Sequence, residues 1–243
     1  MSATTLDPAE IAKFAAMAEA WWDPKGDFAP LHRMNPARLG FLREAIGAHF
    51  GRGAGRRPFE GLTMIDVGCG GGLVTEPMAR LGATVTGLDG AEESVKAAQA
   101  HAIEGGLAID YRQGTAEDLA ASGAAFDVVL ALEIIEHVAD MYAFCEAAVA
   151  LAKPNGLVIF STINRTAKAR ALAITAAERI LRWVPHGTHD FEKLVKPDEL
   201  AAALLPLVAD APVGLSFNPL TGAWKTSEDV SMNYFLTVTK PAV

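Results

Sequence analysis

The stretch Thr63–Gly90, TMIDVGCGGGLVTEPMARLGATVTGLDG, decides the fold prediction. Its first residues are apolar enough for a buried strand, which we expect to end at Val67. Glycines follow at positions 68, 70 and 72, and an amphipathic stretch predicts a helix that begins near Gly72. A second apolar strand ends at Asp89. A strand, a glycine-rich turn, a helix and another strand predict a parallel βαβ unit with a ligand at the turn.

The spacing of these glycines excludes two common nucleotide loops. A dinucleotide fingerprint needs G-x-G-x-x-G, but Leu73 or Thr75 stands where the third glycine would be, counting from Gly68 or Gly70. No GK[ST] follows, so the loop is not a P-loop either. The G-x-G-x-G pattern resembles the first motif of class I S-adenosylmethionine-dependent methyltransferases. That resemblance implies that Gly68, Gly70 and Gly72 bind this cofactor.

The rest of the chain continues the strand and helix alternation. Apolar strand candidates separated by helices predict a parallel sheet that is covered on both faces. With two late strands near 213–219 and 232–239, we expect an α/β fold with a doubly wound, mostly parallel sheet of seven strands. We divide the chain into an N-terminal helical cap and linker, 1–58, and a methyltransferase domain, 59–243, with a helical insertion at 164–185. The five earlier strand candidates are LTMIDV, ATVTGLD, LAIDYRQG, FDVVLAL and GLVIFSTI.

The N-terminal part predicts two helices around a turn-rich stretch at 23–36. Asp7 with Pro8 is a typical helix start, and Asn35 with Pro36 repeats it. Trp21 and Trp22 fit two roles, which are packing of the N-terminal helix on the sheet or lining the mouth of a substrate site. We expect packing.

Composition restricts partners and location. The 243 residues carry a net charge of −8, which argues against nucleic acid as a partner. The two cysteines, Cys69 and Cys145, offer no disulfide framework or CxxC pair. We see no signal peptide and no apolar run long enough to span a membrane. A cytoplasmic protein is expected, with contact at the inner face of the membrane left open.

Two acidic residues follow the second and third predicted strands. Asp89 at the strand end can accept hydrogen bonds from both ribose hydroxyls of a nucleoside, although a turn aspartate is the plainer alternative. Glu117 in GTAEDL lies where the resembled class borders adenine. It could equally be an acid at the start of a helix.

The fourth strand ends in a group of candidate functional residues. Leu132 lies at the carboxyl end, where ligands bind in doubly wound sheets, and the sequence EIIEH follows. Glu133, Glu136 and His137 are spaced i, i+3 and i+4, so on one helical turn they would share a face. They could hold a divalent cation such as Mg²⁺, with His189 as a fourth partner. Alternatively, Glu136 and His137 are hydrogen-bonded residues of the pocket.

Longer motifs make the resemblance specific. FAAMAEAWWD, FAPLHRMNPARLGFL, STINRTAKA and VPHGTHDFEKLVKPDEL are similar to signatures of the ubiquinone biosynthesis O-methyltransferase family, from about Phe14 to Tyr234. The resemblance implies two O-methylations of polyprenylated phenols or quinols, one on a 2-polyprenyl-6-hydroxyphenol and one on 3-demethylubiquinol. It also implies that Arg38, Gly68, Asp89 and Leu132 contact S-adenosylmethionine. Asn155 and Phe217 depart from the family's usual glycine and tyrosine.

Such a reaction requires removal of a phenolic proton, because a phenol of pKa about 10 is mostly neutral near pH 7. His137, with Glu136 beside it, is the candidate catalytic base. A cation on Glu133, Glu136 and His137 that binds the catecholate is the alternative.

The substrate's tail resides in a bilayer, and the segment 167–184 has a basic face opposite an apolar face that carries Trp183. We expect a lid that contacts anionic membrane lipid, against the alternative of a helix docked on the protein's own core. Other ubiquinone-biosynthesis proteins are further expected partners. A different class I enzyme, such as an RNA 2′-O-methyltransferase, and a non-catalytic S-adenosylmethionine-binding module are the rival interpretations.

Overall fold

We describe the protein from a computed structural model, which places residues 5–171, 190–218 and 221–242. Its centre is one sheet with the strand order β3-β2-β1-β4-β5-β8-β6-β7. The first five of these strands in space are parallel, whereas β8, β6 and β7 each pair antiparallel with their neighbours. The fold is therefore α/β and doubly wound, as predicted. The strands are β1 Thr63–Val67, β2 Thr84–Asp89, β3 Asp110–Gln113, β4 Phe126–Leu132, β5 Ala152–Ile163, β6 Val213–Asn218, β7 Ala223–Ser227 and β8 Asn233–Thr239.

The sheet has eight strands, which corrects the prediction of seven. The additional strand is β7, which forms a hairpin with β6 at the edge of the sheet. Apolar and polar residues alternate only weakly in its sequence, AWKTS, and none of its residues is fully buried. An exposed edge strand has one free side and packs few apolar residues, so it lacks the sequence pattern on which the prediction rested.

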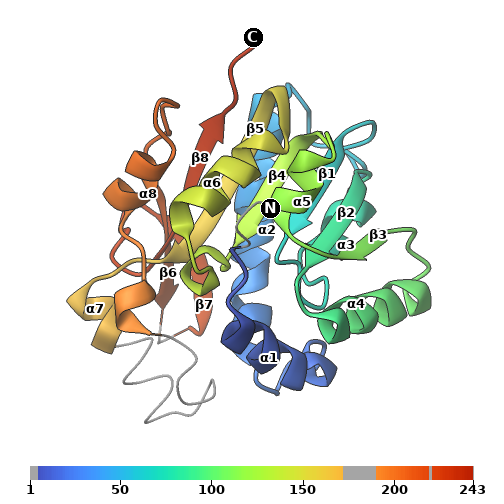
Figure 1. Cartoon of the computed structure of the whole chain (residues 1–243), viewed down its shortest axis with the longest axis horizontal. Coiled ribbons are helices and arrows are strands. Elements are labelled where there is room, and N and C mark those ends of the chain that lie inside the picture. Colours follow the sequence, from blue (N-terminus) through green and yellow to red (C-terminus); the bar gives the residue numbers. More distant parts are fainter. Residues whose placement is uncertain (1–4, 172–189, 219–220, 243) are drawn as a thin grey trace.

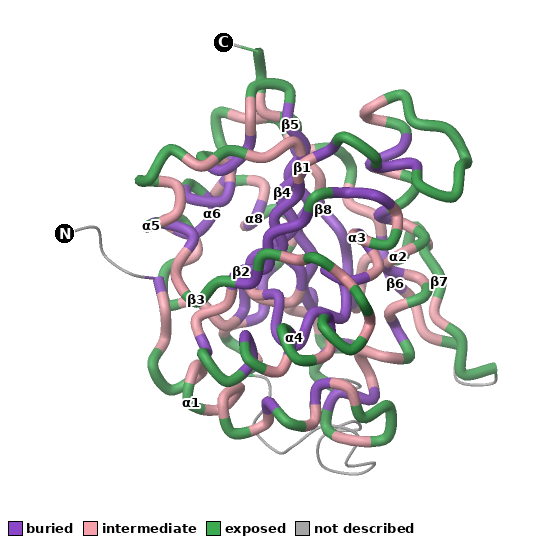
Figure 2. The backbone as a smooth tube through the Cα atoms, turned by 90° about the vertical axis from the view of Figure 1, so that its right-hand side faces the viewer, coloured by how far each residue is buried: buried purple, intermediate pink, exposed green. Residues whose placement is uncertain are grey.

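Alternate residues of the parallel strands pack into two separate cores, because neighbouring side chains on a strand point to opposite faces. Ile65 and Val129 belong to a core shared with α6 and α8. Met64 and Leu130 belong to a core shared with α2 and α3. The result is three layers, and Figure 2 shows the buried backbone concentrated along the central strands. The covering helices are α2 Ala29–His49, α3 Thr75–Arg80, α4 Glu92–Glu104, α5 Ala116–Ala121, α6 Met141–Ala150 and α8 Pro197–Ala203.

The second N-terminal helix begins earlier than predicted. α2 starts at Ala29, so that Pro36 lies inside it rather than at its first turn. The Asn35 side chain does not cap the helix; it donates a hydrogen bond to the Leu73 carbonyl at 2.8 Å. The buried residues Leu42 and Ile46 anchor the helix on the sheet. This tertiary packing outweighs the local signal of Asn-Pro, and it places α2 in the core of the domain.

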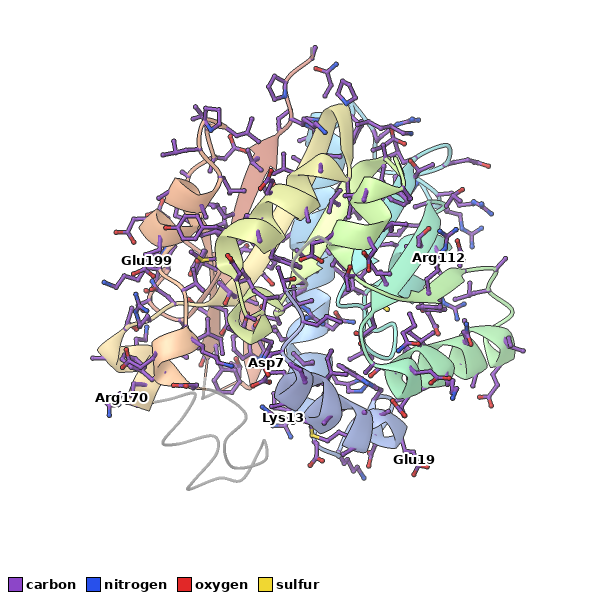
Figure 3. The ribbon with its side chains drawn as sticks, in the orientation of Figure 1. Asp7, Lys13, Glu19, Arg112, Arg170 and Glu199 are labelled. Carbon is purple, nitrogen blue, oxygen red and sulfur yellow. The ribbon has the colours of Figure 1, made fainter. Side chains whose placement is uncertain are left out.

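The first helix, α1 (Pro8–Ala16), starts as predicted, with Asp7 accepting a hydrogen bond from the backbone N–H of Ala9 at 3.0 Å. A short helical turn, η1 (Ala18–Ala20), follows it. Figure 1 shows α1 below the lower edge of the sheet, where the parallel strands end. Figure 3 shows the labelled side chains of Asp7 and Lys13 at this same edge. The N-terminal segment therefore covers the edge at which doubly wound sheets bind ligands.

The remaining short elements follow β4 and β5. They are η2 Ile135–His137, α7 Ala167–Ala169 and η4 Phe191–Lys193. Most of the predicted insertion at 164–185, together with His189, lies outside the described residues, so its helical character stays a prediction. Among the described residues, none of the helices has the length and apolar character needed to cross a membrane.

Candidate functional site

A cleft lies at the carboxyl ends of the central strands, between the sheet and the N-terminal segment. Together with the solvent space at its open side, it spans about 750 Å³. We call the side formed at the ends of β1, β2 and β3 the loop wall and the side formed by residues 5–21 the cap wall. The loop wall comprises Val67, Gly68, Gly70, Leu88, Asp89, Gly90, Gly114, Thr115, Ala116 and Glu117, and the cap wall comprises Thr5, Leu6, Asp7, Glu10, Ile11, Phe14 and Trp21.

Two of the three predicted glycines line this cleft. Gly68 and Gly70 have φ values of 72° and 51°, a backbone conformation that side chains disfavour. A Cβ atom on Gly70 would lie 2.4 Å from the Trp21 ring of the cap wall. Gly72 does not line the cleft; a Cβ there would lie 2.2 Å from the Tyr111 hydroxyl. The missing Cβ atoms of the first two glycines therefore let Ile134 and Trp21 pack against the main chain, and that of the third lets Tyr111 do so.

The loop reaches its helix later than predicted, because α3 begins at Thr75 rather than near Gly72. The Thr75 hydroxyl donates to the buried Asp66 carboxylate at 2.6 Å and so ties the start of the helix to β1. Burial raises the pKa of Asp66 to about 6. Sequence reasoning missed Asp66, because an acidic residue within an apolar strand was counted only as part of the strand.

Asp89 holds the glycine loop in place. One carboxylate oxygen accepts from the Gly70 backbone N–H at 2.9 Å, and the other accepts from the Ala91 N–H at 2.8 Å. Each carboxylate oxygen has a further lone pair, so Asp89 can still accept hydrogen bonds from a ligand. Burial raises the pKa of Asp89, while these two hydrogen bonds oppose the rise. Asp89 therefore lines the cleft where a ligand was predicted, and it also stabilises the turn as an ordinary turn aspartate does.

Glu117 lines the same cleft, and its carboxylate is buried without a hydrogen-bond partner among the described residues. The residue is 9% exposed. Buried polar groups are normally satisfied, and an unpaired carboxylate is costly. Thr115 caps the helix through the Asp118 N–H, so Glu117 is not needed for capping. Its carboxylate therefore fits a ligand that brings a hydrogen-bond donor, such as an exocyclic amine.

Arg38 and Leu132 are buried beside the cleft rather than in its lining. The Arg38 guanidinium donates to Asn35 through Nε at 3.3 Å and through Nη2 at 2.9 Å. Burial lowers the pKa of Arg38, and the charges of Glu133 and Asp66 oppose that effect. Leu132 packs with α2 and α3. The cofactor contacts predicted for these two residues therefore stay predictions.

Glu133 lies at the end of β4 with a φ of 54°, which is rare for a residue with a side chain. Two hydrogen bonds hold its carboxylate: the Ser161 hydroxyl donates at 2.6 Å and the Asn233 amide donates at 2.8 Å. Such a conformation costs about 1–3 kcal/mol and persists where the surroundings enforce it, often at functional sites. Glu133 also lines the cleft.

The structure does not unite Glu133, Glu136 and His137 as a metal-ligand set, which corrects the sequence prediction. Within the described ranges, no group of three or more His, Cys, Asp or Glu side chains could hold a metal ion. The left-handed backbone at Glu133 interrupts the helical register, since the helical turn η2 begins only at Ile135. The i, i+3, i+4 rule therefore does not apply.

Glu136 and His137 point to different surroundings. Glu136 is 4% exposed, accepts a hydrogen bond from the Thr162 hydroxyl at 2.9 Å and does not line the cleft. Burial, together with the charge of Glu133, raises the pKa of Glu136. His137 does line the cleft, and its Nδ1 lies 3.0 Å from Oε2 of Glu10. The geometry thus favours His137 over Glu136 for a direct role in chemistry.

The cap wall is the part of the site that sequence reasoning largely missed. Trp21 was expected to pack, and it does, since its ring stacks on Phe28 with centroids 3.7 Å apart. It also lines the cleft, while its predicted role at the mouth of a substrate site stays a prediction. Trp22 donates to the Gly71 carbonyl at 2.9 Å. Glu10 and Phe14 had no distinguishing pattern beyond the amphipathic helix that carries them.

Comparisons with known proteins agree with this architecture. The model of a family described as "Methyltransferase domain" matches residues 65–160. A protein of Caulobacter vibrioides named ubiquinone biosynthesis O-methyltransferase is 55% identical over 97% of this chain and 95% of its own length. A protein of Maricaulis maris with the same name is 54% identical over 98% of this chain and 94% of its own.

Solved structures show the same fold at low identity. A magnesium protoporphyrin IX methyltransferase of Synechocystis PCC 6803, solved with bound S-adenosylhomocysteine, has a TM-score of 0.62. It is 20% identical over 94% of each chain. A SAM-dependent methyltransferase of Aquifex aeolicus has a TM-score of 0.61 at 15% identity, over 97% of this chain and 99% of its own.

Proposed function

This chain belongs to the ubiquinone biosynthesis O-methyltransferases, and from that membership we propose that its cleft binds S-adenosylmethionine and a polyprenylated phenol or quinol. The chain is an S-adenosylmethionine-dependent methyltransferase that acts on oxygen. The observation that carries the proposal is the identity of 55% over nearly the full length of both chains, combined with a glycine loop and an acidic strand end in one cleft. We propose further that the chain catalyses both O-methylations, that of a 2-polyprenyl-6-hydroxyphenol and that of 3-demethylubiquinol.

The loop wall supplies groups that suit the cofactor. We assign Asp89 to the ribose hydroxyls and the unpaired Glu117 carboxylate to the adenine amine. We assign the methionine end of the molecule to the loop at Gly68 and Gly70, which lines the cleft. We propose that Arg38, which is buried near the charges of Glu133 and Asp66, contacts the carboxylate at the methionine end of the cofactor. Leu132 contributes packing behind the site, and Gly72 contributes by admitting Tyr111.

When bound, S-adenosylmethionine supplies a methyl group activated by its positive sulfur. The protein must align the acceptor oxygen with that methyl group, and such alignment can be worth about 7–11 kcal/mol. It must also remove the phenolic proton. We assign this task to His137, because it lines the cleft whereas Glu136 does not. Glu136 then supports the site through its hydrogen bond with Thr162.

A divalent cation is not part of this proposal. The sequence suggested Mg²⁺ at Glu133, Glu136 and His137, but these side chains bind other partners in the structure. Turnover of a short-tailed demethylubiquinol with labelled S-adenosylmethionine tests the function directly. We expect methyl transfer to the ring oxygen. Absence of transfer to this substrate, at protein concentrations that bind S-adenosylhomocysteine, would contradict the proposal.

The bilayer location of the substrate supports transient contact with anionic lipid at the inner membrane face, and contact with other proteins of the pathway. We propose that this contact is peripheral. Flotation with anionic liposomes tests it. We expect the full chain to float and a chain without residues 166–184 to stay behind; equal flotation of both would contradict the lipid role of that segment.

A further inference from the structure

One contact across the cleft joins the cap wall to the candidate base. Oε2 of Glu10, on α1, lies 3.0 Å from Nδ1 of His137, which follows β4. The two side chains are 18% and 12% exposed, respectively, and both line the cleft. Phe14, one turn further along α1, presents its ring edge-on to the imidazole, with centroids 5.1 Å apart and planes at 86°. α1 therefore contacts the imidazole through both a carboxylate and an aromatic ring.

This contact indicates which nitrogen of the His137 imidazole carries the proton. The hydrogen bond from His137 is the largest of the effects that lower the pKa of Glu10, to about 2. An ionised carboxylate can only accept, so Nδ1 must be the donor in the pair. The neutral ring then carries its proton on Nδ1 and a lone pair on Nε2. This tautomer is the one that can take a proton at Nε2.

We propose that Glu10 is the positioning residue that orients His137 as the base of methyl transfer, an inference that rests on the proposed function. The phenolic proton passes to Nε2 of His137 as the oxygen's electron pair forms the new O–CH₃ bond. The S–CH₃ bond breaks, its electron pair stays on sulfur, and neutral S-adenosylhomocysteine leaves. The Glu10 carboxylate stabilises the imidazolium that forms, as the aspartate of a catalytic triad stabilises its histidine.

The same residue links the base to closure of the cleft. Glu10 is carried by α1, and Lys193 of η4 joins that helix through Asp7 at 3.0 Å and through Glu10 at 3.7 Å. The Glu10 carboxylate therefore reaches His137 when α1 covers the cleft. This arrangement assembles the base after the site is closed to water.

A purely structural role for Glu10 is the alternative, since Lys13 also lies 3.4 Å from its carboxylate. The two roles separate in the variants Glu10→Ala and Lys13→Gln. Glu10→Ala removes the acceptor of His137, whereas Lys13→Gln removes another partner of Glu10 on the same helix and leaves the contact with His137 in place. Glu10→Gln keeps an acceptor without the charge.

Turnover and a tautomer measurement test the proposal together. We expect kcat to fall about 10- to 100-fold in Glu10→Ala, within the 10²- to 10⁴-fold that a general base contributes in total. Glu10→Gln should lie between it and the wild type, and Lys13→Gln should keep the wild-type kcat. Calorimetric binding of S-adenosylhomocysteine shows whether each variant is folded.

Long-range ¹H–¹⁵N spectra, with His137 assigned by its loss in His137→Asn, report the tautomer. We expect the Nδ1–H form in the wild type and its loss in Glu10→Ala. Wild-type kcat in a folded Glu10→Ala variant, or an Nε2–H tautomer in the wild type, would overturn the inference while wild-type turnover still supports the function. If the wild type itself transfers no methyl group, the proposed function fails instead.

Discussion

The two walls of the cleft are built in opposite ways. The loop wall follows the ends of consecutive strands, and a side chain at one strand end holds the main chain of the neighbouring loop, as the pairing of Asp89 with Gly70 shows. The cap wall comes from the N-terminus and acts through side chains that meet distant residues, as the pairing of Glu10 with His137 shows. Under the proposed function, the groups assigned to the cofactor are therefore held by local contacts, whereas the candidate base depends on long-range packing.

The walls meet at Gly70, and a change there should have the largest effect. In Gly70→Ala the new Cβ would lie 2.4 Å from the rigid Trp21 ring, at a residue with positive φ. We expect binding of S-adenosylhomocysteine to weaken about 100-fold or more, with a lower melting temperature. Calorimetry measures the affinity. Gly40→Ala is the matched control, because no atom lies within 4 Å of its Cβ position; equal affinities in the two variants would break the comparison.

The loop wall alone is tested by Asp89→Asn. The amide would turn a donor toward one of two backbone N–H groups, those of Gly70 and Ala91, that now share the carboxylate. One buried donor left unpaired costs about 1–3 kcal/mol, so we expect affinity for S-adenosylhomocysteine to fall about 10- to 100-fold. Titration calorimetry measures this fall. The exposed Asp110→Asn should bind as the wild type does, and a wild-type affinity in Asp89→Asn would remove the ribose assignment.

A smaller effect is expected at the adenine end of the same wall. Glu117→Gln keeps the shape of the side chain but replaces its unpaired carboxylate with a neutral amide. A charge-assisted hydrogen bond is about twice as strong as a neutral one, so we expect a loss of about 1 kcal/mol, or about 5-fold in affinity. Competition between S-adenosylhomocysteine and its inosine analogue, which has an oxygen in place of the adenine amine, sharpens the test. We expect Glu117→Gln to discriminate less against the inosine analogue than the wild type does. Asp118→Asn, on the next residue, should change neither value.

The smallest expected effect concerns Asp66, the buried residue of β1 beneath the loop wall, and it depends on pH. Burial raises the pKa of Asp66 to about 6, above its ordinary value, so the folded state favours the protonated form. This contribution to stability is present below the unfolded pKa of about 3.9 and is lost as pH rises through about 6. Asp66→Asn cannot ionise. Its melting temperature relative to the wild type should therefore rise by a few degrees between about pH 5 and pH 7.5; a constant or falling difference would contradict the direction of the shift.

Sequence reasoning was strongest where the signal is local. The strand ends at Val67 and Asp89 are where the pattern put them, and β6 and β8 lie at the two late apolar runs. It failed at β7, which is an exposed edge, and at α2, whose start depends on packing rather than on Asn-Pro. The supposed metal set failed for a related reason, since one left-handed residue, Glu133, breaks the spacing rule that the set required.

The sequence by itself determined the βαβ unit, the glycine loop and the family, because glycine spacing and alternating apolar strands act within a few residues of one another. Only the tertiary structure decided that Glu10 and Phe14 meet His137, that no described residue pairs with the Glu117 carboxylate and that Glu136 lies outside the lining of the cleft. Contacts between residues this far apart in the chain depend on how the layers pack, and no local pattern encodes that geometry.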